Sequence, residues 1–200
     1  MIDKPRIALL VLLAAAAALA APALKRRIGP AQLEPRPAAP PARPPASVTA
    51  PAAPAPAAGG ERTVSLRKGS RDLSKPSGKL LVVHFWATWC ASCEDELPGL
   101  LAWAREVKGA GDVEVLAVSV DESWEKVDGW LSERGVAGLP LALDPKGATA
   151  RAFGTVKFPE TWFLAPDGAV LAHWVGPRDW TTRATLAELA TLRKEAAPGT

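Results

Sequence analysis

The sequence predicts an α/β domain in which helices cover a mixed β-sheet. Two unbroken apolar runs, at 80–87 and 113–120, are rich in β-branched and aromatic residues, which is typical of strands buried on both faces. A segment with helical signals follows each run. The chain then continues with two short apolar segments around the turn Pro166-Asp167-Gly168 and a last amphipathic segment. Strands that first alternate with helices and then form a hairpin indicate a sheet with both parallel and antiparallel pairs.

The first half of this domain contains two helices after the two buried runs. A short strand at 63–66 precedes a turn-rich stretch that ends at Gly78. A helix should begin near Cys90 and be kinked by Pro98; its apolar face is formed by Leu97, Leu100, Leu101, Ala104 and Val107. Asp121 or Ser123 can cap a second helix, which should end before Gly135.

The second half is built from shorter elements. We expect a strand at 139–143 and a short helix at 149–153. Strands at 161–164 and 169–175 should pair around the proline-containing turn, and a last helix should span about 182–194. The domain as a whole is expected to occupy residues 61–196.

The N-terminal 60 residues have a different composition. Residues 1–28 combine Lys4 and Arg6 with an apolar run, which predicts either a secretory signal peptide or an N-terminal membrane anchor. Residues 29–60 are rich in proline and alanine and carry few large apolar side chains, so we expect a disordered linker. These features predict export to the cell envelope.

The overall composition excludes several classes of protein. The net charge is only +3, and no basic stripe interleaved with aromatic residues is present, so nucleic-acid binding is not expected. The chain has 2 cysteines, too few for a fold held together by disulfides. Apolar burial must therefore stabilise the domain.

Both cysteines lie in the segment Trp89-Cys90-Ala91-Ser92-Cys93, directly after the first buried run. A thiolate at the first turn of a helix is favoured by free backbone N–H groups and by the helix dipole, which lower the pKa of Cys90. Cys93 lies one turn later, where it can attack a mixed disulfide formed by Cys90. A structural zinc site is the alternative, but it requires four ligands, and only His84 and His173 are available to complete it. We therefore predict a redox-active dithiol with no metal and no further cofactor.

The segment from His84 to Pro98, HFWATWCASCEDELP, resembles the thioredoxin superfamily, in particular exported proteins of the TlpA/ResA type and thioredoxins of cytochrome c maturation. A second segment, from Phe158 to Gly168, is similar to the family pattern that contains a proline followed by E-T-x-F-L. Residues 120–154 match the length of the extra helix-strand insertion of this branch. The resemblance covers roughly residues 61–195 and implies a three-layer thioredoxin-like fold.

The resemblance also implies roles for individual residues. The peptide bond before Pro159 should be cis, and Trp89, Phe158 and Pro159 should form the substrate-docking surface, where the backbone of Phe158 pairs with an extended segment. Glu96, one helical turn after Cys93, should tune the cysteine pair, either by accepting the Cys93 proton or by raising the thiol pKa through charge repulsion. As an alternative, Glu96 is one of three acidic residues that favour the helix dipole.

The two histidines are assigned differently. His84 stands near a strand position where thioredoxins carry aspartate, so it either shuttles protons beneath Cys93 or is a buried neutral imidazole. His173, on the second hairpin strand, is expected to be structural or exposed.

These features predict a thiol–disulfide oxidoreductase of the periplasm or cell envelope. The resemblance implies reduction of disulfides in exported proteins, such as apocytochrome c or the copper-site cysteines of an oxidase, with a membrane thiol reductase as electron donor. An oxidant that forms disulfides would use the same residues. A copper chaperone using Cys90, Cys93 and His173 is a further alternative. Peroxidase activity is not expected, because Thr88-Trp89-Cys90 lacks the spacing and the preceding proline of a peroxiredoxin.

Overall fold

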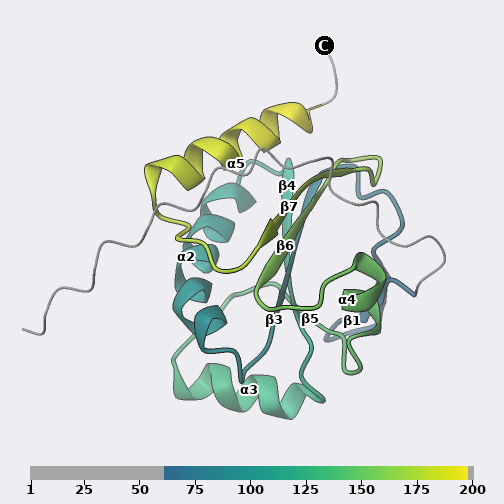
Figure 1. The fold of residues 1–200 in the computed structure, drawn as a ribbon, viewed down its shortest axis with the longest axis vertical. Helices are drawn as coiled ribbons and strands as arrows, with labels where there is room; N and C mark the ends of the chain where they lie inside the picture. The colour runs from purple at the N-terminus through teal and green to yellow at the C-terminus, as the bar shows by residue number, and fades with distance from the viewer. Residues whose placement is uncertain (1–60, 198–200) are drawn as a thin grey trace, which may run out of the picture. The chain divides into compact units, whose positions relative to one another are not determined.

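A computed structural model describes residues 61–197, and the predicted signal or anchor and the proline-rich linker lie outside this range. The described residues form one mixed sheet of seven strands in the order β2-β1-β5-β4-β3-β6-β7. Helices lie on both faces of this sheet (Figure 1). The α/β fold with a mixed central sheet is therefore confirmed. Within residues 61–197, no helix combines the length and apolar character required to cross a membrane.

The two apolar runs form the centre of the sheet. β3 (Leu80–Trp86) is buried at all of its positions and pairs in parallel with β4 (Val113–Ser119). β5 (Leu141–Leu143) extends the parallel part beyond β4, and β6 (Glu160–Leu164) pairs antiparallel with β3 on its other side. β7 (Val170–Val175) completes the predicted hairpin with β6. A strand with neighbours on both sides and a helical layer on each face is apolar at most positions, which is why these runs do not alternate.

Alternate side chains of β3 enter two separate cores. Leu80, Val82 and Trp86 contribute to the core that contains α2 (Ala91–Lys108), α3 (Trp124–Glu133) and α5 (Arg183–Glu195). The core on the other face contains Val83 and Phe85 together with side chains of α4 (Ala148–Phe153). His84 shares the face of Val82 and Trp86 by the same alternation. The position of β3 thus directs His84 toward the layer that holds α2.

The helix termini follow the sequence signals. Cys90 caps α2, Ser123 caps α3 and Thr182 caps α5; each side chain accepts a hydrogen bond from the backbone N–H three residues later. Of the two caps considered for α3, the structure therefore selects Ser123. α2 is continuous from Ala91 to Lys108, although Pro98 lies inside it on an exposed position.

The short strands on the β2-β1-β5 side of the sheet were the least predictable elements. The stretch between Leu66 and Gly78, expected to be only a turn, contains β2 (Ser70–Asp72), which pairs with β1 (Thr63–Ser65). Its sequence Ser-Arg-Asp carries no apolar alternation, so its strand character comes from pairing with β1 alone. β5 is also shorter than the expected strand at 139–143 because it starts after Pro140, whose nitrogen has no proton to donate.

Candidate active site

The two cysteines lie at the start of α2, after the short loop that follows β3. Cys90 and Cys93 form a disulfide, with their Cα atoms 5.3 Å apart. Cys90 occupies the N-cap of α2, and its sulfur accepts a hydrogen bond from the backbone N–H of Cys93 at 3.3 Å. The same N–H would stabilise a thiolate on Cys90 after reduction, because a free donor at a helix N-terminus favours negative charge.

The two sulfur-bearing residues differ in accessibility. Cys90 is 8% exposed, whereas Cys93 is fully buried. Trp89, directly before Cys90, is 68% exposed and contacts the ring of Phe158 edge-on, with 5.8 Å between the ring centroids. The Phe158–Pro159 peptide bond is cis, as the resemblance implies. Trp89 and Phe158, 69 positions apart in the chain, are thus brought together next to Cys90, the more exposed of the two cysteines.

Glu96 is buried on α2 one turn after Cys93, and its carboxylate is held by the loop between β7 and α5. The indole N–H of Trp180 donates to Oε1 at 2.5 Å, and the backbone N–H of Arg178 donates to Oε2 at 3.2 Å. Burial raises the pKa of Glu96 to about 7, while both hydrogen bonds act in the opposite direction by favouring the charged form. A carboxyl group with a pKa near neutrality can both accept and donate a proton in this range.

His84 is fully buried next to Glu96. Its Nδ1 lies 2.9 Å from the hydroxyl of Thr161 and 3.9 Å from Oε1 of Glu96. Burial lowers the pKa of His84 to about 3, so the ring is neutral at physiological pH. Its Nε2 has no hydrogen-bond partner among the described residues. This geometry fits the buried neutral imidazole better than the proton shuttle.

His173 lies in a different environment. It stacks on Trp162, with ring centroids 3.7 Å apart, and its Nε2 is 2.9 Å from the carboxylate of Glu160. Within residues 61–197, no three His, Cys, Asp or Glu side chains are gathered closely enough to hold a metal ion. The three residues of the copper hypothesis, Cys90, Cys93 and His173, are therefore not assembled into one site.

Two residues with direct contacts to the site were given no role there by the sequence, which offers Asp121 only as a helix cap and Trp180 no role at all. Asp121 is buried at the end of β4 and accepts hydrogen bonds from the backbone N–H and the hydroxyl of Thr88, at 2.9 and 2.7 Å. It thereby fixes the loop that carries Trp89 and Cys90. An acidic residue directly after a buried parallel strand was the available signal, because the ends of neighbouring parallel strands meet at one edge of a sheet. Trp180 offered no such signal; it stands 84 positions from its partner Glu96.

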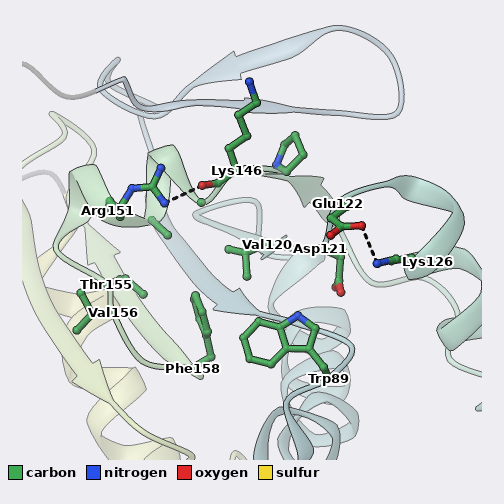
Figure 2. Close-up of a pocket in the computed structure, with 13 residues that line it drawn as sticks. Trp89, Val120, Asp121, Glu122, Lys126, Lys146, Arg151, Thr155, Val156 and Phe158 are labelled. Atoms are coloured by element: carbon green, nitrogen blue, oxygen red, sulfur yellow. Dashed lines mark hydrogen bonds and ion pairs between the residues drawn. The ribbon is translucent and has the colours of Figure 1, made fainter.

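An open groove of about 580 Å³ begins at Trp89 and Phe158. Val120 lies near its centre, and Figure 2 shows Lys146 and Arg151 on the side of Val120 away from the two aromatic rings. The ion pair of Glu122 with Lys126 borders the groove at another side. The dithiol thus adjoins a buried polar cluster, formed by Glu96, His84 and Trp180, and an open groove with an aromatic end.

Comparison with known proteins finds relatives that are thiol–disulfide oxidoreductases by name. The chain is 29% identical over 106 residues to the thiol:disulfide interchange protein HelX of Rhodobacter capsulatus, which covers 53% of this chain and 57% of HelX. It is 33% identical over 100 residues to the thiol-disulfide oxidoreductase ResA of Bacillus subtilis, which covers 50% of this chain and 55% of ResA. The chain thus matches little more than half the length of these relatives.

A solved structure and a family assignment extend the comparison. A crystal structure from Chlorobium tepidum, described as that of a candidate thiol:disulfide interchange protein DsbE, has a TM-score of 0.58 and 26% identity; the match covers 66% of this chain and 96% of that one. The AhpC/TSA family matches residues 49–173. The chain therefore belongs to the AhpC/TSA family of thioredoxin-like proteins, and its relatives within that family are of the TlpA/ResA type.

Proposed function

We propose that this protein is a thiol–disulfide oxidoreductase of the cell envelope that reduces disulfides in exported proteins. The unequal burial of the two cysteines is the observation that carries the proposal. Cys90 retains 8% exposure beside the exposed Trp89, whereas Cys93 is completely buried. A partner disulfide can therefore approach only one of the two sulfurs, and the other is reserved for the second step.

The reaction begins with the reduced protein. The thiolate of Cys90 attacks one sulfur of the partner disulfide, so that a Cys90–partner disulfide forms and the other partner sulfur leaves as a thiolate. The thiolate of Cys93 then attacks the Cys90 sulfur, which forms the Cys90–Cys93 disulfide and releases the second partner sulfur. Two electrons pass from the protein to the partner, and no cofactor beyond the cysteine pair is required.

Cys93 must lose its proton before the second step, and we assign this role to Glu96, which is buried one helical turn after Cys93 on α2. A carboxylate has about four lone-pair sites, and the N–H groups of Trp180 and Arg178 use only two of those on Glu96. A pKa of about 7 allows Glu96 to hold the Cys93 proton transiently and to return it near neutral pH. Neutral His84 behind it adds no competing positive charge.

The partners of the reaction are also part of the proposal. Docking takes place on Trp89, Phe158 and Pro159; neither backbone group of Phe158 is used in a backbone hydrogen bond within residues 61–197. An extended segment can therefore pair with that backbone. The family resemblance favours apocytochrome c or copper-site cysteines as substrates and a membrane thiol reductase as electron donor. Residues 1–28 would export the domain to the periplasm or anchor it at the membrane.

A trapping experiment tests the proposal. In Cys93→Ser the second step is blocked, so Cys90 should remain joined to its partner as a mixed disulfide that is stable to alkylation and cleaved by reductant. The matched control is the double variant Cys90→Ser/Cys93→Ser, which should trap nothing. If Cys93→Ser accumulates no mixed disulfide when expressed in a cell envelope, the oxidoreductase proposal is contradicted.

A further inference from the structure

The groove beside the dithiol has two chemically different ends. At the end nearest Cys90, the exposed ring of Trp89 faces Phe158, and the exposed side chain of Val156 adds to the apolar surface. Beyond Val120, the lining changes to the loop before α4 and to α4 itself, which contribute Lys146 and Arg151 (Figure 2). An occupant that spans the groove must therefore be apolar at one end and complementary to positive charge at the other.

The positive charge of this basic end is available to a partner. Lys146 and Arg151 are exposed, and no carboxylate in the range 61–197 forms an ion pair with either of them. Lys126 lines the same groove but is neutralised by Glu122 at 2.7 Å. Asp121 is buried, and hydrogen bonds from Thr88 and Ser119 occupy its carboxylate. The exposed charges of the groove that have no ion-pair partner are thus positive, and they lie on two neighbouring side chains.

Arg151 is held in place rather than free to rotate. One of its terminal nitrogens, Nη1, donates to the backbone oxygen of Lys146 at 2.7 Å, so the guanidinium is tied to the loop before α4. A guanidinium has five donors, and this contact uses one of them. The remaining donors match the two oxygens of a carboxylate, and less side-chain entropy is lost on binding because the group is already positioned.

We propose that Lys146 and Arg151 select substrates in which an acidic side chain lies a few residues from the disulfide cysteine in an extended segment. This inference rests on the proposed oxidoreductase function and names the substrate class of the same site. A polypeptide fits better than a compact anion because the groove joins the aromatic docking surface at Cys90 to the basic end without interruption. Lys146 and Arg151 are specificity residues here and take no part in the sulfur chemistry.

Two synthetic peptides with an intramolecular disulfide test this inference. They share one sequence except that two residues a few positions from a cysteine are Glu in one peptide and Lys in the other. Reduced wild-type protein should reduce the Glu peptide with a kcat/KM at least about tenfold higher, which corresponds to about 1.4 kcal/mol. In the double variant Lys146→Glu/Arg151→Glu the preference should reverse, and in wild type it should shrink with rising salt, because exposed charges are screened.

Matched controls separate the possible causes. Glu122→Gln/Lys126→Gln removes the ion pair from the same groove without changing its net charge, so the preference for the Glu peptide should persist. A small uncharged aromatic disulfide should be reduced at equal rates by all variants, since it does not reach the basic end. Lys146→Gln/Arg151→Gln provides a milder variant if the charge reversal does not fold; it should abolish the preference without inverting it.

The outcomes distinguish this inference from the proposed function. If wild type reduces both peptides equally while it reduces the small disulfide, the selection of acidic segments is wrong and the oxidoreductase function stands. If glutathione disulfide shows the same sensitivity to Lys146→Glu/Arg151→Glu as the Glu peptide, the groove selects small carboxylates and the inference is also wrong. If wild type reduces no disulfide at all, both proposals fail.

Discussion

The two regions next to the dithiol differ in burial and in how their polar groups are paired. The polar cluster of Glu96, His84 and Trp180 is buried, and most of its polar atoms are paired within the protein. The groove that begins at Trp89 is open, and no carboxylate among the described residues pairs with the two cations at its basic end. Burial shifts pKa values strongly, whereas exposed groups keep their charge and remain free to bind.

This difference divides the work between the two cysteines. In the proposed mechanism, the fully buried Cys93 depends on the proton affinity of Glu96, and Cys90, which is 8% exposed, reacts with a partner that docks at Trp89. Substitutions in the cluster should therefore change stability, its pH dependence and the second step of the reaction. Substitutions in the groove should change which substrate is bound and leave stability almost unchanged.

The largest effect is expected where the two regions meet. Cys90→Ser removes the attacking sulfur, so reduction of every disulfide, peptide or small molecule, should fall to the background rate. Cys93→Ser should also stop multiple turnover but still allow one attack, detected by mass spectrometry as a covalent adduct on Cys90. Adduct formation by Cys90→Ser through Cys93 would contradict the assigned order of attack.

Glu96→Gln should alter the pH dependence of stability in the oxidised protein. The pKa of Glu96 rises from an ordinary 4.5 to about 7 on folding, so the folded state holds an extra proton between these values. Its contribution to the free energy of unfolding is full below about pH 4.5 and is lost as the pH rises to 7, by at most about 1.4 kcal/mol per pH unit. Glu96→Gln removes this loss. Urea denaturation at pH 4.5 and 7.5 measures the free energy of unfolding of wild type and variant. If this free energy changes equally with pH in both proteins, the raised pKa of Glu96 is refuted.

His84→Asn should change the pH dependence of the free energy of unfolding in the opposite direction. The pKa of His84 falls from 6.5 to about 3 on folding, so the unfolded chain binds the extra proton. Its contribution is full above about pH 6.5 and is lost as the pH falls toward 3. The same urea series on His84→Asn should therefore show less loss of stability in acid than wild type. If this variant instead moves the midpoint of the pH–rate profile by a full unit, His84 takes part in proton transfer.

The smallest effect on stability is expected in the groove. Trp89→Ala removes a ring that is 68% exposed, so the free energy of unfolding should change by no more than about 0.5 kcal/mol. The KM for a peptide disulfide should nevertheless rise about tenfold, because exposed aromatic side chains are frequent binding hot spots. Equal losses in stability and in peptide binding would mean that Trp89 is structural and would remove the contrast between the regions.

How much of this was predictable from the sequence depends on distance along the chain. The buried strands, the helices and the Cys90–Cys93 pair were predictable because apolar runs, caps and a three-residue spacing are local signals. Pro159 and Glu96 were assigned only through a family motif. The contacts of Trp180 with Glu96 and of Asp121 with Thr88 span 84 and 33 positions, and only the folded chain brings these residues together. The basic groove likewise depends on where α4 packs, which no local pattern encodes.

The reduction potential of the Cys90–Cys93 pair tests the central claim of a reductase most directly. Equilibration of the purified chain with a defined dithiol or glutathione buffer, followed by alkylation of free thiols, measures this potential. We predict a value near or below about −270 mV, as for a thioredoxin-type reductant. A value near about −120 mV, the range of a strong oxidant, would contradict the proposed direction of electron flow and assign the same residues to disulfide formation.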